Sequence, residues 1–294
     1  YKAPGADSTA TTAVSEVKNA GTYTATVTIT NKNYAISSNE TYAKTATTTF
    51  KVEQKALTVT ADNKTVTYGN SAPAYTFSCD GLVSTDSAAS LGTPEFACSY
   101  STTSTVAGNP YEIKVSGLTN SNYKITYYSG TLTVNKREVT LNWGTTSFVY
   151  NGEAQTPNPT ANNVVTGNDL GLTVTITGEN ITGSSAINVG TYTAEAAITN
   201  DNYVIAAGNQ TATFTITARA LTLNWGTTSF VYDGKAQTPN PTVNNAVTGD
   251  NLWLTVTITG ENITGSPAAA INVGTYTAEA AITNNNYVIA ADNK

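Results

Sequence analysis

Apolar and polar residues alternate along short segments of this chain, and similar segments return at regular intervals. The clearest are residues 57–59, 139–143 and 221–225, in which every second residue is apolar. A period of two places successive side chains on opposite faces of a strand, so each segment predicts a half-buried β-strand. No stretch of ten residues or more has a convincing helical period. The pattern therefore predicts an all-β chain.

Two further signals follow the opening strand. The first is a turn: residues 150–152 (Tyr-Asn-Gly) and 232–234 (Tyr-Asp-Gly) contain dipeptides that adopt positive φ at low steric cost. The second is Gly-Thr-Tyr followed by an Asn-rich bend, as in 190–192 with 199–202, and then a final strand such as 214–216. This order predicts a closing hairpin, and the Gly-x-Tyr element resembles a tyrosine corner, whose hydroxyl bonds back to the backbone.

These signals repeat with a fixed spacing. Residues 141–150 return unchanged as 223–232, an offset of 82 positions from 150 to 232. A unit of this length has the size of one small domain. The first predicted module is partial and the last lacks its final strand. The four predicted modules span residues 1–54, 55–136, 137–218 and 219–294.

Several short strands in a unit of this size favour an immunoglobulin-like β-sandwich. A β-grasp-like sheet is the alternative, but it needs a crossover helix, and no segment is a good candidate for one. The junction at residues 216–221 has no Gly/Ser-rich or Pro-rich tether between the last strand of one module and the first strand of the next. We therefore expect stiffly coupled modules arranged as a rod.

Charge and hydropathy narrow the classes of partner. The formal net charge is −6 and no basic run exceeds Lys136-Arg137, which argues against nucleic-acid binding. No apolar run approaches the roughly 20 residues that a membrane-spanning helix needs, so we expect no membrane segment. Because the chain begins at Tyr1 and not at Met, we expect it to be an excerpt. Self-association into fibres by strand exchange is an alternative, but the partial first module offers a whole hairpin where the last lacks one strand.

The chain has two cysteines, Cys79 and Cys98, both in the second module. An isolated pair in an oxidising compartment favours a disulfide, which would contribute roughly 3 kcal/mol by the chain-entropy model. The alternatives are two free thiols or a metal pair, and the chain contains no His or other thiol to complete a metal site. We predict a structural disulfide between Cys79 and Cys98.

The sequence offers little for catalysis. The absence of His excludes Ser/His/Asp and Cys/His arrangements. Glu195 and Glu279 occupy equivalent positions opposite the apolar face of their strand, so we expect both to be solvated. A cation site needs several oxygen ligands including carboxylates, yet the bend residue Asp201 corresponds to Lys32 in the first module. We therefore predict turn chemistry at the bend, no cofactor, no metal and no catalytic residue.

The tryptophans differ from one another. Trp143 and Trp225 share a face with the apolar residues of their strands and are expected in the core. Trp253 replaces Gly171 of the preceding module and points away from the face of its neighbouring leucines. Trp253 is therefore the candidate residue for binding a glycan or a protein partner.

Residues 56–136 resemble the MBG-type repeat in its YGX form. The resemblance is carried by residues 56–61 (Ala-Leu-Thr-Val-Thr-Ala), 67–73 (Thr-Tyr-Gly-Asn-Ser-Ala-Pro), 81–83, 91–94, 122–123 and 130–134. The two later modules are similar to relatives of that repeat with a Tyr-Asn-Gly or Tyr-Asp-Gly (YDG) turn. The resemblance implies tandem all-β modules of bacterial cell-surface and secreted adhesin-like proteins. It carries no catalytic residues.

Two functions remain open for such a chain. The first is a non-catalytic structural stalk segment of a bacterial extracellular or surface protein. The second is a multivalent adhesion array in which the modules bind a glycan or a host or partner protein, with affinity multiplied by avidity. Near-identical neighbouring modules favour the stalk, because duplication extends reach by roughly 30 Å of strand length per module.

Overall fold

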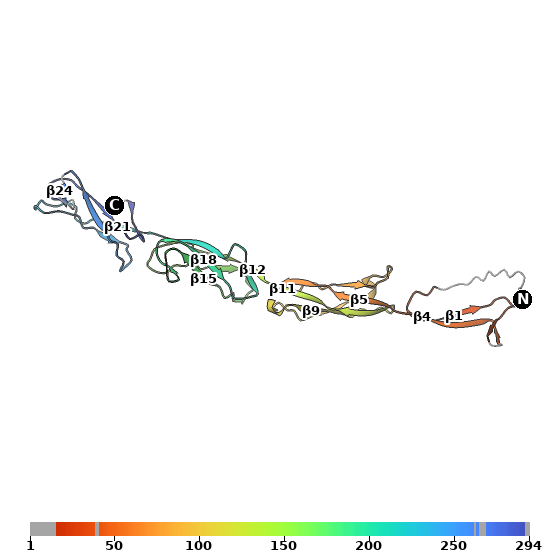
Figure 1. Cartoon of the computed structure of the whole chain (residues 1–294). Coiled ribbons are helices and arrows are strands. Elements are labelled where there is room, and N and C mark those ends of the chain that lie inside the picture. The colour runs from red at the N-terminus through yellow and green to blue at the C-terminus, as the bar shows by residue number, and fades with distance from the viewer. Residues whose placement is uncertain (1–15, 39–40, 262, 265–268, 292–294) are drawn as a thin grey trace. The chain divides into compact units, whose positions relative to one another are not determined.

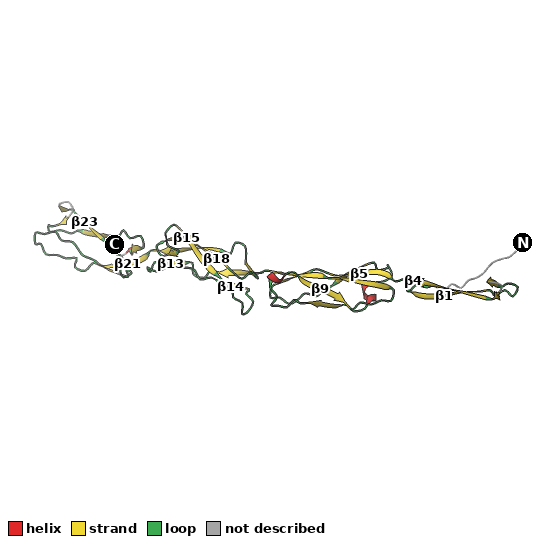
Figure 2. Ribbon diagram, turned by 60° about the horizontal axis from the view of Figure 1, so that its bottom comes forward, coloured by secondary structure: helices red, strands yellow, loops and turns green. Residues whose placement is uncertain are grey.

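A computed structural model describes residues 16–38, 41–261, 263–264 and 269–291 of the chain (Figure 1). The chain forms two compact units, Tyr1–Asn135 and Lys136–Lys294. The described residues form β-strands and loops, with two short 3₁₀ turns, η1 (Ala88–Leu91) and η2 (Val106–Gly108), in the second module (Figure 2). The all-β class predicted from the sequence is confirmed.

The first unit begins with a long antiparallel pair. Strand β1 (Gly21–Thr28) pairs with β4 (Thr45–Val52), and the short strands β2 (Ile36–Ser38) and β3 (Thr41–Ala43) pair between them. Tyr23 lies opposite Phe50 in the register of β1 and β4, with ring centroids 5.8 Å apart. This pair is the closing element predicted for the partial first module.

The second module contains two sheets. The first sheet has the order β10-β5-β7 and the second the order β6-β11-β9-β8. Alternation along the strands buries one side chain in two, as at Leu57 and Val59 in β5 and at Leu132 and Val134 in β11. The strands of this module are β5 (Lys55–Ala61), β6 (Lys64–Thr67), β7 (Phe77–Asp80), β8 (Glu95–Cys98), β9 (Tyr111–Ser116), β10 (Tyr123–Tyr128) and β11 (Gly130–Asn135).

The third module repeats this arrangement in the second unit. Its sheets have the orders β14-β12-β19 and β13-β20-β18-β15, with a small added pair β16-β17. Phe214 and Tyr192 are almost fully buried, and burial of a side chain of this kind contributes roughly 1.5–3 kcal/mol. The strands are β12 (Arg137–Asn142), β13 (Ser147–Val149), β14 (Thr160–Asn162), β15 (Thr173–Gly178), β16 (Ile181–Thr182), β17 (Ser185–Ala186), β18 (Gly190–Ala197), β19 (Tyr203–Ile205) and β20 (Thr211–Thr217).

The fourth module has the same opening sheet, β22-β21-β27, and the pairs β23-β26 and β24-β25. Among the described residues, no strand occupies the place that β20 takes in the third module. Phe230 and Tyr232 are 41% and 61% exposed. The strands are β21 (Arg219–Asn224), β22 (Thr242–Asn244), β23 (Thr255–Thr259), β24 (Ile263–Thr264), β25 (Ala269–Ala270), β26 (Thr277–Ala281) and β27 (Tyr287–Ile289).

Each of the last three modules contains parallel strand pairs. The opening strand pairs in parallel with the strand after the bend: β5 with β10, β12 with β19, and β21 with β27. In the second and third modules the next strand pairs in parallel with the final one, β6 with β11 and β13 with β20. Immunoglobulin sheets are essentially antiparallel, so these parallel pairs do not confirm the immunoglobulin-like sandwich, which stays a prediction. The alternative β-grasp fold needs a crossover helix, and the described residues contain none.

The predicted closing hairpin is only partly right. Strands β18 and β20 pair antiparallel, with Tyr192 opposite Phe214. The bend between them, however, leads into β19, which crosses to the other sheet and pairs with β12. Tyr203 and Ile205 are both buried there, on either side of the partly exposed Val204. Burial of these two apolar side chains against the opening strand explains why the chain leaves the hairpin.

Candidate functional site: the junctions between modules

A tyrosine corner stands at the start of the first strand of the closing hairpin, β18 in the third module, as predicted. The Tyr192 hydroxyl donates to the backbone oxygen of Asn188 at 2.6 Å. Its ring stacks on Phe214 with centroids 5.3 Å apart, which fixes the loop over the core. The equivalent bonds join the hydroxyl of Tyr23 to the oxygen of Asn19 at 2.9 Å, and the hydroxyl of Tyr276 to the oxygen of Asn272 at 2.8 Å.

The Asn-rich bend is a side-chain-capped turn. In the fourth module, Asn284 Oδ1 accepts from the backbone N–H of Asn286 at 3.0 Å, and Asn284 Nδ2 donates to the oxygen of Asn251 at 2.9 Å. The backbone bond from residue i+2 recurs between Asn122 and Asn120 at 2.9 Å and between Asn202 and Asn200 at 3.1 Å. The prediction of turn chemistry at the bend is confirmed.

The same bend holds the preceding module through Asn286. Its Oδ1 accepts from the backbone N–H of Val189 at 2.9 Å, and its Nδ2 donates to Asn188 Oδ1 at 2.9 Å. Asn188 is also the residue whose backbone oxygen caps the Tyr192 corner. One side-chain amide of the fourth module is therefore bonded at both ends to the corner loop of the third module.

The first unit contains an equivalent contact. Asn122 Oδ1 accepts from the backbone N–H of Ala20 at 2.8 Å, and Asn122 Nδ2 donates to Asn19 Oδ1 at 3.0 Å. Asn19 caps the corner of Tyr23 in turn. We call the Asn122 and Asn286 contacts the asparagine clamps. Because two junctions with different flanking sequences use the same atoms, the clamp is a specific feature of the repeat.

A second contact at the junction of the third and fourth modules joins two tyrosines through one carboxylate. Asp250 Oδ2 accepts from the Tyr150 hydroxyl of the third module at 2.8 Å and from the Tyr287 hydroxyl of its own module at 2.5 Å. The two rings meet edge to face, with centroids 5.3 Å apart. Tyr150 and Tyr287 are each only 5% exposed, so the contact excludes most water.

The electrostatics of this contact favour neutral tyrosines. Burial, followed by the hydrogen bond to Asp250 and the negative charge of Asp250, raises the pKa of Tyr150 to about 12. Burial and the same carboxylate also raise the pKa of Tyr287. Both phenols therefore act as hydrogen-bond donors at neutral pH.

Close packing and a further polar contact complete this junction. Gly152, at φ +82°, approaches Val247 so closely that a Cβ at this glycine would lie 2.9 Å from Val247 Cγ1. Arg219 donates from Nη1 to the Tyr150 oxygen at 3.4 Å and from Nε to the Asn245 oxygen at 2.6 Å. The guanidinium of the fourth module thus bridges its own loop and the backbone of the third.

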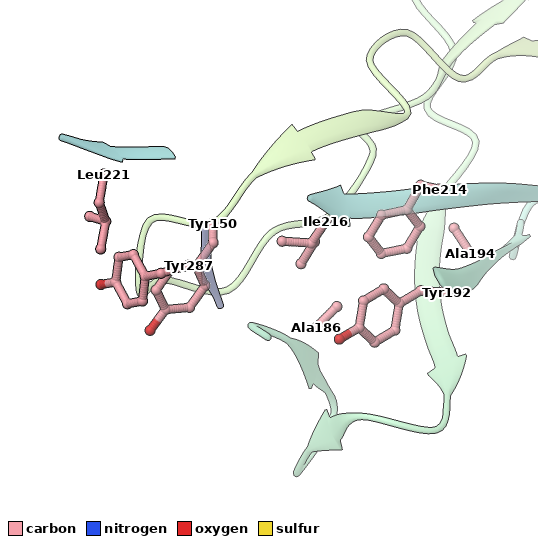
Figure 3. Packing of buried hydrophobic residues seen from close by; sticks show 8 residues of the cluster. All are labelled: Tyr150, Ala186, Tyr192, Ala194, Phe214, Ile216, Leu221 and Tyr287. Atoms are coloured by element: carbon pink, nitrogen blue, oxygen red, sulfur yellow. The ribbon is translucent and has the colours of Figure 1, made fainter. Parts of the chain in front are cut away.

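The hydrophobic core is continuous across this junction. Figure 3 shows the buried cluster, in which Leu221 and Tyr287 of the fourth module lie beside Tyr150 of the third. A set of mainly polar contacts alone would leave neighbouring modules loosely associated, because most surface hydrogen bonds contribute little net stability. The shared apolar cluster gives this junction the character of a domain interior. Its buried members are Tyr150, Ala186, Tyr192, Ala194, Phe214, Ile216, Leu221 and Tyr287.

Sequence reasoning missed the junction residues. It treated the Asn-rich bend as local turn chemistry and gave no role to Asp250 or to the amide of Asn286. A signal was present, because an Asn precedes the tyrosine of the bend in Asn122, Asn202 and Asn286. The corner loops carry their own Asn two residues before Gly-Thr-Tyr. These loop residues are Asn19, Asn188 and Asn272.

Cys79 and Cys98 are free cysteines in the structure. They lie on β7 and β8, which belong to different sheets of the second module, and both are half-buried. Burial raises the pKa of the Cys79 thiol, which keeps it protonated. The structure does not show the disulfide, which therefore stays a prediction to be measured by thiol alkylation under denaturing, non-reducing conditions.

Trp253 is exposed, with 58% of its surface accessible. Its φ is +47°, close to the +59° of Gly171, which occupies the equivalent position in the third module. Both backbone N–H groups donate at 2.9 Å to a side chain two residues earlier, Asn251 for Trp253 and Asp169 for Gly171. The loop therefore has the same conformation in both modules, and in the fourth it carries an exposed indole.

The remaining predicted residues take simple positions. Trp143 and Trp225 are half-buried and pack against the core clusters of their modules. The Trp143 indole N–H donates to the oxygen of Asn209 at 3.3 Å. Glu195 and Glu279 lie on the exposed faces of β18 and β26. No group of three or more potential metal ligands occurs among the described residues.

The repeat matches known families over most of its length. The family model of the MBG domain (YGX type) matches residues 57–133, and that of the MBG domain matches residues 137–220 and again 221–294. The chain belongs to the MBG domain family. The resemblance predicted from the sequence is thereby confirmed, with MBG domains in tandem. No match was found among curated proteins or among solved structures.

MBG domains occur in surface and secreted proteins, so the chain has the character of a repeat region of such a protein. Among the residues that the structure describes, no helix has the length and hydrophobicity of a membrane span.

Proposed function

We propose that this chain is a non-catalytic structural stalk segment of a bacterial extracellular or surface protein, in which MBG modules are joined by specific junctions. The asparagine clamp is the observation that carries the proposal. It recurs with the same donors and acceptors at Asn122 and at Asn286. A binding array with independent modules does not need such a contact, whereas a spacer that holds its neighbours in place does.

The second junction contact supports the same conclusion. Asp250 accepts hydrogen bonds from a tyrosine of each neighbouring module, and both rings are buried. Truncation of a buried residue in such a contact costs several kcal/mol because its partners are left unpaired. The junction therefore restricts the orientation of the fourth module relative to the third at a free-energy scale well above thermal energy.

The stalk function predicts that length and binding are separable. Removal of residues 137–218 from the full-length protein on cells should shorten the reach of whatever the protein presents, without changing its binding to a soluble ligand. Fluorescent Fab fragments against the outermost part would report height above the membrane. Loss of soluble-ligand binding on deletion of this one module, with folding of the remainder intact, would instead favour adhesion.

Trp253 favours adhesion to a glycan or protein as the second candidate. An exposed aromatic ring offers a flat apolar surface to a sugar or an apolar side chain. The third module, with Gly171 at this position, is the natural control within the same chain. Binding of the chain on a glycan array that disappears in Trp253→Gly would support adhesion by the fourth module, and equal signals from both proteins would remove it.

A further inference from the structure

We infer that the second and third modules bear tension, each through a shear clamp between a strand near its start and its last strand. The inference goes beyond the stalk function, because it concerns how one module responds to force. It rests on a feature of the topology: in the second and third modules, a strand near the start of the module lies parallel to its last strand. These pairs are β6 with β11 and β13 with β20.

In the third module, β13 and β20 form the shear clamp. Phe148 lies opposite Ile216, and the ladder extends at both ends. At one end the Thr215 N–H donates to the Thr146 oxygen at 3.0 Å, and at the other the Tyr150 N–H donates to the Thr217 oxygen at 2.9 Å. The Thr217 hydroxyl adds a bond to the Phe148 oxygen at 3.0 Å.

The parallel direction decides how this ladder is loaded. Tension enters the third module at β12, which is itself paired in parallel with β19, and reaches β13 once β12 gives way, while the end of the module is pulled the other way through β20. Two parallel strands pulled in this manner slide past each other, so their hydrogen bonds are stretched together. An antiparallel hairpin pulled at its two open ends would lose its bonds one at a time. The parallel pair therefore requires several bonds to break at once.

The second module repeats the geometry. Lys64 lies opposite Leu132 and Thr67 opposite Asn135, and the Tyr68 N–H donates to the Asn135 oxygen at 2.9 Å. Side chains below the clamp are buried in both modules, with Val66 and Val134 in the second and Ile216 in the third. Water therefore reaches the ladders from one side only, which slows their exchange for bonds to water.

Single-molecule force spectroscopy of the full chain, held at its two ends, tests the inference. Forced unfolding is governed by the unfolding barrier, so the clamp appears directly in the force. The second and third modules should each give a sharp peak, and rupture at 147–217 should release about 25 nm of chain at roughly 3.5 Å per residue. Smooth extension of both modules without resolved peaks would overturn the inference.

The direction of pulling provides a control that leaves the clamp sequence almost unchanged. In a chain with Cys79 and Cys98 replaced by Ser, handles at Ser147→Cys and Thr215→Cys pull β13 and β20 apart from the same end. The same ladder then opens bond by bond, and we expect a several-fold lower force for nearly the same released length. Equal forces in the two directions would contradict a shear clamp.

A single side-chain bond provides the chemical control. Thr217→Val removes the hydroxyl that bonds to the Phe148 oxygen and keeps the size and branching of the side chain. It should lower one of the two end-to-end peaks and leave the peak of the second module unchanged. If both peaks keep their force, the β13–β20 ladder does not bear the load.

Discussion

At the scale of single residues, Trp253 shows how the repeat has been modified at the expense of local stability. Its φ of +47° lies in the left-handed region, in which a side chain with a Cβ is strained by about 1–2 kcal/mol. The third module meets the same requirement with Gly171. Because the Trp253 ring is largely exposed, its packing offsets little of this strain. A strained, exposed aromatic residue is therefore a feature to be explained by what it contacts outside the module.

Trp253→Gly should stabilise the fourth module by about 1 kcal/mol, because relief of the backbone strain exceeds the entropy that glycine loses on folding. The reverse change is not symmetric. A Cβ at Gly171 would lie 2.0 Å from Thr199 Oγ1, so Gly171→Trp should destabilise the third module by at least about 2 kcal/mol. Urea unfolding measures both variants. A destabilised Trp253→Gly protein would show that the indole packs more than its exposure indicates.

The Tyr150–Asp250 contact gives the chain a pH dependence in the alkaline range. The pKa of Tyr150 is about 12 in the folded chain and about 10 in an unfolded one. A group whose pKa is raised by folding contributes stability that is present below its unfolded pKa. That stability is lost as the pH rises from about 10 towards 12.

The free energy of unfolding should therefore fall between about pH 10 and pH 12, and Tyr150→Phe should remove part of that fall. Asp250→Asn should remove a smaller part, since burial is the larger cause of the raised pKa and persists without the charge. Urea unfolding at fixed pH values measures all three proteins. An identical pH profile for Tyr150→Phe and the unsubstituted chain would contradict the assignment.

At the scale of elements, the bend of the fourth module makes two kinds of contact. The Asn284 side chain bonds within the turn, and the Asn286 side chain bonds to the corner loop of the preceding module. The corner itself is fixed by the Tyr192 hydroxyl. Turn, corner and clamp thus form one hydrogen-bonded chain between two core structures. Loss of any member is expected to weaken the junction without unfolding either sheet.

Asn286→Ala should destabilise the junction by about 1–2 kcal/mol, because it leaves the Val189 N–H and the Asn188 amide without their partner. Asn285→Ala is the matched control: Asn285 is the exposed neighbour in the same bend, and its truncation should cost less than about 0.5 kcal/mol. Thermal unfolding of both variants measures the difference. Equal effects of the two substitutions would show that Asn286 supports only the local turn.

The same elements show what the sequence could predict. Alternation was sufficient for the strands, as at 139–142, where Val139 and Leu141 are buried. It was not sufficient for their neighbours: Tyr203–Ile205 alternates as a hairpin strand would, and its parallel pairing with β12 follows from a long-range choice of core. The asparagine clamp was missed for a similar reason. An Asn precedes the bend tyrosine at positions 122, 202 and 286, but only the docked preceding module shows what its side chain bonds to.

At the scale of the whole molecule, the third module shares part of its core with the fourth. Tyr150 is 5% exposed and lies in one buried cluster with Leu221 and Tyr287 of the fourth module. The third module therefore presents a surface that forms part of a core with the docked fourth module. The free energy of unfolding of such an array is the sum of module and interface contributions. A substitution that weakens the interface therefore lowers the stability of both modules that share it.

Tyr150→Ala should therefore destabilise the fourth module as well as the third, because it removes a ring from the shared cluster and a donor from Asp250. Hydrogen exchange of the β21 and β27 amides measures the effect across the junction, and we expect faster exchange there. Tyr232→Ala, at the exposed equivalent position, is the control and should leave these amides unchanged. If Tyr150→Ala accelerated exchange only in the third module, the two modules would be energetically independent.

If the junction fixes the third and fourth modules to each other, the distance between a residue of one and a residue of the other has a single value. Spin labels at Glu195→Cys on β18 and Glu279→Cys on β26, both exposed, can be introduced after replacement of Cys79 and Cys98 by Ser. Pulsed electron–electron double resonance then measures the separation in the full chain. We expect a single narrow distribution that broadens when Asn286 and Asp250 are both changed to Ala. A broad distribution with the junction residues intact would contradict a fixed junction.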